Sequence, residues 1–381
     1  MTVRIPPELL PGDGRFGSGP SKVRTEAVRA LADAGAGYLG TSHRREGVRA
    51  VVRAAREGLT ELFALPNGYE VLLGTGGSTL FWDAAAFGLV VHRAEHLVFG
   101  EFSSKFAAVT AGAPFLDDPF VIESEPGTHP DLVVDGSVDV YAFPHNETST
   151  GVMMDVRRPA KAEGLMLVDG ASSAAGLRVD PTQFDAYYFA PQKAFAADAG
   201  IWVALCSPAA IERIERVAAT GRWVPPSLSL PIALENSRLD QTYNTPPLAS
   251  IFLLADSVRW MLDNGGLEWT TSRCDQSAEI VYGWAEASAH ATPYVAKPSE
   301  RSRTIACIDF VDTVDAAAVA VALRDNSILD TESYRKLGRN QLRIALFPAI
   351  EPDDVAALTR CIDFVIDALS PPNPNLRRSR L

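Results

Sequence analysis

The sequence predicts an α/β fold built on a mostly parallel sheet, followed by a smaller α+β unit. In the first 220 residues, short apolar runs bounded by Asp, Gly or Pro alternate with longer stretches of helical periodicity. Such runs are typical of strands that are buried on both faces of a helix-covered sheet. After about residue 220 the alternation ends, and long helical stretches with few strand-like runs follow. A chain of 381 residues, 47% of them hydrophobic, is long enough to bury the cores of two such units.

The elements follow from periodicity and turn signals. In the first unit we expect helices over 27–39, 48–65, 79–89 and 103–111, and strands over 70–73, 96–99, 138–142, 165–168, 186–189 and 201–205. Residues 222–231 and 241–247 are rich in proline and are expected to be irregular. Further on we expect helices over 249–264, 268–290, 316–325 and 353–369, and strands over 304–310 and 341–345.

Charge and composition exclude several classes of protein. The chain has 35 Lys and Arg against 47 Asp and Glu, a net charge of −12, which argues against a nucleic-acid partner but not against small anionic ligands. We expect no membrane span, because no apolar run approaches the required length of about 20 residues. Residues 1–16 lack a signal-peptide pattern, and the four cysteines are scattered without metal-ligand spacing. A cytoplasmic protein without a bound metal is therefore expected.

Two residues indicate the chemistry. Asp169 ends one apolar strand, and Lys193 follows the next, so both are expected at the sheet edge where α/β proteins bind ligands. Burial lowers the pKa of a lysine and frees its amine as a nucleophile. Pyridoxal phosphate needs such a Lys for its Schiff base and an Asp to pair with its pyridinium nitrogen. Taken alone, the pair is equally compatible with a turn Asp and a surface Lys.

A glycine-rich turn, Gly74-Thr75-Gly76-Gly77-Ser78-Thr79, follows the first strand and opens a helix. Backbone N–H groups at a helix N-terminus favour a phosphate. The turn lacks the Gly-Lys-Ser/Thr of a P-loop and the third Gly of a dinucleotide site, so a nicotinamide oxidoreductase is not expected. Phe102 after another strand could stack on a pyridine ring, and Thr148 could hydrogen-bond the ring hydroxyl region.

Several motifs occur together in a fixed order: Thr41-Ser42-His43-Arg44, Gly76-Gly77-Ser78-Thr79, His145-Asn146-Glu147-Thr148, Val168-Asp169-Gly170, Pro191-Gln192-Lys193 and Tyr243-Asn244-Thr245-Pro246-Pro247. In this combination the chain resembles the phosphoserine aminotransferases, from the Gly17 region to Arg343. The resemblance implies a fold-type I pyridoxal phosphate transferase. Its large α/β domain, residues 15–260, would hold a mainly parallel seven-stranded sheet. Residues 261–381, with the N-terminal segment 1–14, would form a smaller α+β domain.

The resemblance also implies roles for particular residues. Lys193 would form the Schiff base with pyridoxal 5′-phosphate and move the α-proton of the substrate, while Asp169 would pair with the pyridine nitrogen. Phe102 would stack on the ring, and Thr148 would bond its O3′ side. The phosphate of the cofactor would be held by turn and loop residues, namely Gly77, Ser78, Thr79 and Gln192.

By the same resemblance, Asn244 and Thr245 would reach the phosphate of the cofactor in a neighbouring subunit, so that the active unit is a homodimer. The substrate would be bound by His43 and Arg44, with Arg343 on its α-carboxylate. Relatives often carry Trp in place of Phe102 and Arg in place of Thr79. Their C-terminal His-Arg element has no clear counterpart here, which leaves open whether Arg335, Lys336 or Arg339 binds the substrate phosphate.

Residues 335–343 contain four cationic side chains and no acid, a local inversion in an acidic chain. Because guanidinium groups match carboxylate and phosphate, this segment favours anionic substrates. We therefore expect reversible transamination between O-phospho-L-serine and 2-oxoglutarate, giving 3-phosphohydroxypyruvate and L-glutamate in serine biosynthesis. The alternatives are a serine– or alanine–glyoxylate aminotransferase and a non-catalytic protein with the same fold. Use of a related phosphorylated substrate in vitamin B6 (pyridoxine) synthesis stays open.

Overall fold

The structure is a computed structural model that describes residues 3–369. Residues 370–381 of the expected smaller domain lie outside the described part of the chain, as do residues 1 and 2. The largest sheet has seven strands in the order β1-β9-β8-β7-β4-β2-β3. These strands are β1 (Glu70–Thr75), β2 (Ala94–Val98), β3 (Phe120–Glu123), β4 (Val140–Pro144), β7 (Leu165–Asp169), β8 (Ala186–Phe189) and β9 (Ile201–Cys206).

Strand direction in this sheet is nearly uniform. The pairs β8–β7, β7–β4, β4–β2 and β2–β3 are parallel, and only β9 runs against both of its neighbours, β1 and β8. The expected mainly parallel seven-stranded sheet is therefore confirmed. Strands β7, β8 and β9 are buried along their whole lengths, as expected when helices cover both faces.

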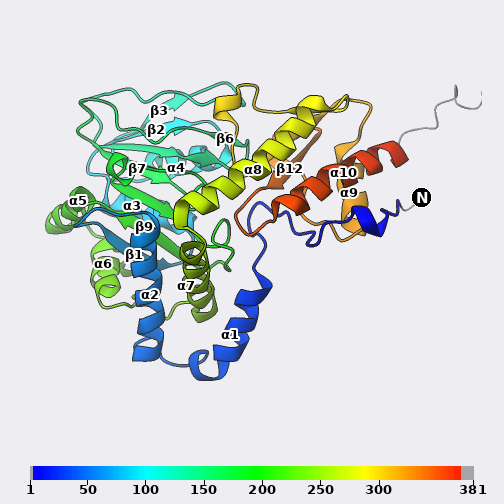
Figure 1. The fold of residues 1–381 in the computed structure, drawn as a ribbon. Coiled ribbons are helices and arrows are strands. Elements are labelled where there is room, and N and C mark those ends of the chain that lie inside the picture. The colour runs from blue at the N-terminus through cyan, green and yellow to red at the C-terminus, as the bar shows by residue number, and fades with distance from the viewer. Residues whose placement is uncertain (1–2, 370–381) are drawn as a thin grey trace, which may run out of the picture.

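Seven helices accompany the large sheet among the described residues: α1 (Thr25–Tyr38), α2 (Glu46–Leu62), α3 (Ser78–Gly88), α4 (Glu101–Ala111), α5 (Pro208–Ala219), α6 (Leu230–Arg238) and α7 (Leu248–Asp263). Helices α2 and α7 pack side by side, with α1 against α7 (Figure 1). The two faces of the sheet carry separate apolar cores. On β8, for example, Tyr187 belongs to one core and Tyr188 to the other, because successive side chains of a strand point to opposite faces.

A second, antiparallel sheet consists of β10 (Ala291–Pro293), β11 (Ile305–Phe310) and β12 (Gln341–Ala345). The long helix α8 (Gly266–Ala287) packs on α10 (Pro352–Leu369), and α10 packs on α9 (Ala316–Asp325) (Figure 1). The observed α8, α9, α10, β11 and β12 agree with the expected elements to within three residues at each end, whereas the three-residue strand β10 was not expected.

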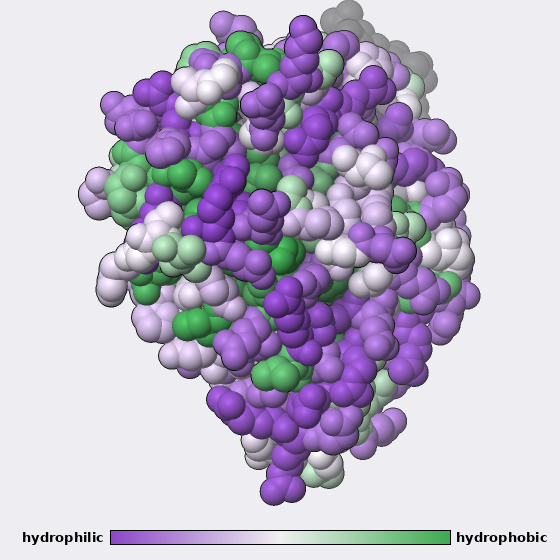
Figure 2. Space-filling view, turned by 90° about the vertical axis from the view of Figure 1, so that its left-hand side faces the viewer, coloured by the Kyte–Doolittle hydropathy of each residue, from purple (hydrophilic) through white to green (hydrophobic). Residues whose placement is uncertain are grey.

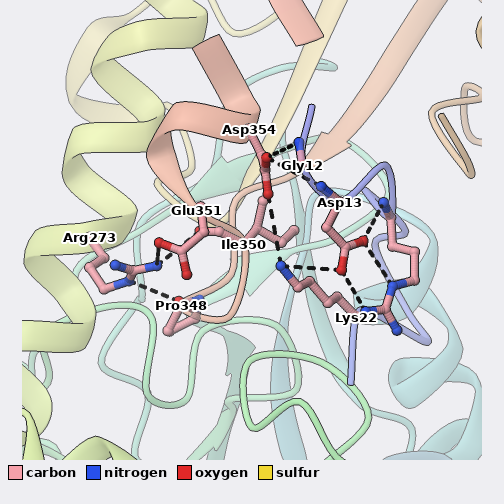
Figure 3. Close-up of polar contacts among 9 residues, drawn as sticks. Gly12, Asp13, Lys22, Arg273, Pro348, Ile350, Glu351 and Asp354 are labelled. Atoms are coloured by element: carbon pink, nitrogen blue, oxygen red, sulfur yellow. Dashed lines mark hydrogen bonds and ion pairs between the residues drawn. The ribbon is translucent and has the colours of Figure 1, made fainter. Parts of the chain in front are cut away.

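The N-terminal segment is tied to α10 by charged and polar contacts. The backbone N–H of Gly12 donates to Asp354 Oδ1 at 2.7 Å, and Lys22 Nζ lies 3.4 Å from Asp13 and 3.9 Å from Asp354 (Figure 3). Nearby, Arg273 of α8 donates to the carbonyl of Pro348 at 2.9 Å (Figure 3). These contacts place the start of the chain beside its last described helix.

Several elements were missed or misjudged at the sequence level. Helix α5 carries clear start signals, Ser207 as N-cap and Pro208 in the first turn, and α6 begins inside the stretch that was expected to be irregular, with Pro231 in its first turn. Proline is tolerated there because its missing N–H would have no helical partner. Strand β3 and the hairpin of β5 (Asn146–Glu147) and β6 (Val152–Met153) were also missed, because they are too short for a periodicity signal.

The surface is mainly hydrophilic on the face that Figure 2 shows, and apolar side chains form separate small patches there. Among residues 3–369, no helix is both long enough and apolar enough to cross a bilayer. Over the same residues, no group of three or more His, Cys, Asp or Glu side chains is arranged to hold a metal ion.

Candidate active site

A cavity of about 270 Å³ lies at the carboxyl edge of the large sheet. Strands β1, β2, β4, β7 and β8 all run in the same direction, so their C-terminal ends meet at this edge. The residue after each end therefore approaches the same space, as expected for ligand sites in α/β folds. The cavity is lined by Ser18, Gly19, Gly77, Ser78, Thr79, Trp82, Phe102, Pro144, Asn146, Thr148, Asp169, Ala171, Gln192, Lys193, Tyr334 and Arg343.

The two residues expected to carry the chemistry, Lys193 and Asp169, share this cavity. Burial lowers the pKa of Lys193 from 10.5 to about 8, with a further lowering by the charge of Arg343, while Asp169 and Glu147 act in the opposite direction. Burial raises the pKa of Asp169 from 3.8 to about 6, against the backbone hydrogen bond from Ala171 and the charge of Lys193. Near neutral pH, a substantial fraction of the amine is neutral while the carboxyl is mostly ionised.

A chain of hydrogen bonds holds the end of Lys193. Its Nζ donates to Thr148 Oγ1 at 2.9 Å, and Thr148 Oγ1 donates to Ser172 Oγ at 2.8 Å. Ser172 in turn donates to the carbonyl of Asn146 and accepts from its side-chain amide. Gly19 has a φ of +140°, and a Cβ there would lie 2.8 Å from Cε of Lys193. Any other residue would be strained by this φ, and its Cβ would displace the end of Lys193.

Phe102 lies at the start of α4, and the buried Glu147 holds this start in place. The Glu147 carboxylate accepts hydrogen bonds from the backbone N–H groups of Phe102 and Ser103, and from the hydroxyl groups of Ser103 and Ser149. A carboxylate is favourable there because the N–H groups of the first turn lack helical partners. The Phe102 ring consequently lies at a fixed place, 5.3 Å from Lys193 Nζ to the ring centroid.

The glycine-rich turn offers unsatisfied polar groups to the cavity. Gly76 has a φ of +109°, and Gly77 is the N-cap of α3. The buried Ser78 Oγ and Gln192 Oε1 have no hydrogen-bond partner among the described residues. Because buried polar groups are normally paired, this part of the cavity is suited to a polar ligand with several hydrogen-bonding oxygens.

Arg343 enters the cavity from β12 of the second sheet. Its Nη1 donates to the carbonyl of Thr148 at 3.3 Å, and its guanidinium lies 5.2 Å from the ring centroid of Tyr334. Its Nε is buried without a partner, and burial lowers the pKa of the group. A partly desolvated cation of this kind is stabilised by an anion.

The other expected substrate cations lie outside the cavity lining. Arg339 donates to Asp309 at 2.5 Å and lies over the ring of Tyr294, and Lys336 pairs with Glu101. Arg335, in the same turn, has no ion-pair partner among residues 3–369. The absence of acids from residues 335–343 in sequence is thus partly compensated by acids from elsewhere in the fold.

Asn244 and Thr245, expected to serve a neighbouring subunit, lie beside His43 and Arg44, the expected substrate-binding pair. Thr245 Oγ1 is 3.3 Å from His43 Nδ1, although the two residues are 202 positions apart. Arg44 and Asn244 are exposed beside them. None of the four lines the cavity of its own chain.

A second, more open hollow of about 600 Å³ is lined by residues that include His129, Arg158, Lys297 and Glu300. Its cations are already paired, since Arg158 binds Asp185 and Lys297 binds Glu300 at 2.7 Å. Its one lysine, Lys297, is exposed and ion-paired, whereas burial lowers the pKa of Lys193 in the smaller cavity. The smaller cavity is therefore the candidate active site.

Trp82 and Tyr334 line the cavity but were not singled out in the sequence. Trp82 had a usable signal, because it follows Ser78 by four residues on α3 and residues four apart share one face of a helix. Tyr334 had none. Its ring lies 6.0 Å from that of Phe102 only because the second sheet brings the 334–339 segment beside α4.

Comparison with known proteins gives the class of this fold and site. The class-V aminotransferase family model matches residues 129–331, which contain Thr148, Asp169 and Lys193. A relative from Mycobacterium leprae is 57% identical over 369 residues, which are 97% of this chain and 98% of that protein. A phosphoserine aminotransferase from Rhodococcus jostii is 55% identical over 369 residues, covering 97% and 99% of the two chains.

A solved structure agrees with these relatives. The crystal structure of a phosphoserine aminotransferase from Cytophaga hutchinsonii is similar to this chain with a TM-score of 0.85 and 26% sequence identity. The similarity covers 91% of this chain and 97% of that one. The chain belongs to the phosphoserine aminotransferase family within the class-V aminotransferases.

Proposed function

We propose that this chain is a pyridoxal phosphate-dependent phosphoserine aminotransferase. It would move an amino group reversibly between O-phospho-L-serine and 2-oxoglutarate, with 3-phosphohydroxypyruvate and L-glutamate as the other pair, and so serve serine biosynthesis. The observation that carries the proposal is the cavity in which Lys193, Asp169 and the unpaired Ser78 hydroxyl come together. Family membership supports the choice of substrates.

The cavity fits the cofactor at each of its functional groups. The unpaired Ser78 Oγ, the N-terminal N–H groups of α3 and the side chain of Gln192 suit the phosphate, with Gly77 and Thr79 beside them. Asp169 would hold the pyridine nitrogen protonated, Phe102 would cover the ring, and Thr148 would bond its O3′ side. When bound, the cofactor supplies an aldehyde that exchanges amines and a ring that withdraws electrons.

The residues of the chain would then bind the substrate and move its proton. Burial lowers the pKa of Lys193, and Thr148 Oγ1 holds its Nζ at 2.9 Å. Lys193 Nζ would take the proton from the substrate α-carbon and deliver it to the cofactor carbon that carries the transferred amino group. Asp169 stays ionised above about pH 6 and keeps its negative charge facing the ring nitrogen. Arg343 would bind the α-carboxylate through the guanidinium nitrogen that has no partner in the chain.

The substrate phosphate requires further cations near the cavity mouth. The 335–339 segment contains three cationic side chains. Lys336 is paired with Glu101 and Arg339 with Asp309. This leaves Arg335 as the cation most available to a ligand. We retain Arg339 as a second candidate, because its partner Asp309 is at the surface and such pairs contribute little.

The active unit would be a homodimer with two shared sites. This is supported by the exposed cluster of His43, Arg44, Asn244 and Thr245, which lies apart from the cavity of its own chain. In the dimer, Asn244 and Thr245 would reach the phosphate of the partner's cofactor, and His43 and Arg44 its substrate. We also propose the domain division 15–260 and 261–381 with 1–14, supported by the contact of Gly12 with Asp354.

Location in the cytoplasm is supported by the cysteines, since Cys206, Cys274, Cys307 and Cys361 are all buried and unpaired. The deciding experiment is a coupled assay that follows glutamate formation from phosphoserine and 2-oxoglutarate, with unphosphorylated serine and 2-oxoglutarate as one control. A second control follows pyruvate formation from alanine and glyoxylate, because that pair yields no glutamate. Turnover that requires the phosphate supports the proposal. Equal turnover of serine, or turnover only with glyoxylate, contradicts it. The phosphorylated hydroxy-amino acid of vitamin B6 synthesis is a further substrate to assay.

A further inference from the structure

Two aromatic side chains lie close to the carboxylate of Asp169, Trp82 in the cavity lining and Tyr188 behind it in the core. The indole Nε1 of Trp82 donates to the Tyr188 hydroxyl oxygen at 3.0 Å and lies 3.4 Å from Asp169 Oδ2. Tyr188 is the register partner of Asp169 on the neighbouring strand, and burial together with the negative charge of Asp169 raises the pKa of its hydroxyl. Because the indole N–H occupies the tyrosine oxygen, the hydroxyl proton of Tyr188 is free to point at the carboxylate. The other oxygen, Asp169 Oδ1, accepts from the backbone N–H of Ala171 at 2.8 Å.

This arrangement is buried and closely packed. Trp82 is 2% exposed and Tyr188 is fully buried. The Tyr188 ring stacks on Phe81 at 4.5 Å between centroids and meets Phe106 edge to face. A rigid apolar setting fixes where the two donors point, and it strengthens a hydrogen bond to a charged acceptor. The donors therefore cannot be replaced by water without rearrangement of the core.

The charged groups around Asp169 stabilise its ionised carboxylate only in part, so hydrogen-bond donors are also required. Lys193 stabilises the carboxylate, whereas the charge of Glu147 and burial destabilise it. His96, which lines the small hollow beneath Asp169, is neutral, since burial lowers its pKa to about 3. It therefore offers no positive charge to the carboxylate. Once Lys193 is engaged with a cofactor, the remaining stabilisation from within the chain comes from hydrogen bonds.

We propose that Trp82 and Tyr188 are positioning residues that keep the Asp169 carboxylate ionised and aimed into the cavity. The proposal rests on the proposed function, because it assigns Asp169 to the pyridine nitrogen. It adds a link between two parts of the site. Trp82 lies one turn after Ser78 on α3, so the helix that offers its N-terminus to the cofactor phosphate also carries the donor that reaches Asp169.

The direction of the pKa shift of Asp169 depends on whether the donors stabilise its charged or its neutral form. Hydrogen bonds from Trp82 and Tyr188 favour the charged carboxylate, so their removal raises the pKa of Asp169. Asp169 would then take up a proton at a higher pH, and the ring nitrogen would lose its counter-charge there. Loss of one hydrogen bond to a charged group corresponds to a shift of about one pH unit.

The test compares three variants of the full chain reconstituted with pyridoxal phosphate. Tyr188→Phe and Trp82→Phe each remove one donor. Tyr187→Phe is the matched control, because it removes a buried hydroxyl from the same strand whose bonds go to His145 and Ser173 on the opposite face. The readouts are the visible absorption band of the bound cofactor between about pH 5 and 9, the dissociation constant of the cofactor at pH 6, and the melting temperature.

We expect the acid-side transition of the band to move up by about one pH unit in Tyr188→Phe and by less in Trp82→Phe, with cofactor binding about tenfold weaker at pH 6. Tyr187→Phe should lower the melting temperature without moving the transition. Two results would overturn this inference while leaving the proposed function intact. One is a wild-type transition in both Tyr188→Phe and Trp82→Phe, and the other is an equal shift in Tyr187→Phe. If Tyr188→Phe does not fold, the Trp82→Phe titration decides. Absence of any band in the wild-type protein would instead overturn the proposed function.

Discussion

The lowered pKa of Lys193 makes a quantitative prediction about how fast the apo-protein captures its cofactor. Only the neutral amine attacks an aldehyde. With a pKa of about 8, about a quarter of Lys193 is neutral at pH 7.5, whereas a lysine at its ordinary value of 10.5 is about 0.1% neutral. The structure therefore predicts roughly 200-fold more reactive amine at that pH, because burial disfavours the ammonium ion.

The measurement is the rate of appearance of the Schiff-base band after pyridoxal phosphate is mixed with apo-protein at a series of pH values. The same reaction with a free lysine derivative serves as the reference for an amine of ordinary pKa, and Lys193→Ala gives the blank. The rate for the apo-protein should rise with pH and level off above about pH 8, whereas the rate for the free lysine derivative should keep rising. A rate that keeps rising to pH 10, in parallel with the free lysine, would refute the argument that the cavity desolvates Lys193.

Three further predictions address the site and its frame. Arg335→Ala should raise the KM for phosphoserine at least about tenfold, while the KM for 2-oxoglutarate changes little. Arg339→Ala should have a smaller effect on the KM for phosphoserine. Equal changes in KM for both substrates would show that Arg335 does not bind the substrate phosphate. Mixing inactive Lys193→Ala with Thr245→Ala chains should restore activity, because one site of each hybrid dimer is then wild-type, whereas sites confined to single chains would show no recovery. Glu147→Gln should lower the free energy of unfolding by about 2–4 kcal/mol in a denaturant titration, since the new amide group would face donors that need an acceptor. An unchanged unfolding midpoint would show that other contacts hold the start of α4.

Much of the fold and part of the site could be read from local patterns. The strands that end at Asp169 and before Lys193 were recognisable because parallel strands buried on both faces are short continuous apolar runs. The glycine-rich turn before α3 was recognisable because a helix start after such a turn is a local feature. Helix α5 was missed although Ser207 and Pro208 marked its start, so that omission reflects an unread signal and not a missing one.

Charge was the feature that local patterns described least well. The sequence showed four cations and no acid in residues 335–343, but the fold brings Asp309 to Arg339 and Glu101 to Lys336. Both partners come from elements distant in the chain, so no spacing rule could have found them. In the same way, the contact between His43 and Thr245 joins residues 202 positions apart.

By itself, the sequence determined the class of fold, the lysine and aspartate at the strand ends, and the glycine-rich turn that opens a helix. Each of these depends on neighbours along the chain. The tertiary structure decided which groups share one cavity and which are already paired. It alone places Trp82 and Tyr188 on Asp169, Thr148 on Lys193 and Arg343 at the mouth of the site. The physical reason is that burial and long-range pairing set the charge and the pKa of each group, and both arise only when distant elements pack together.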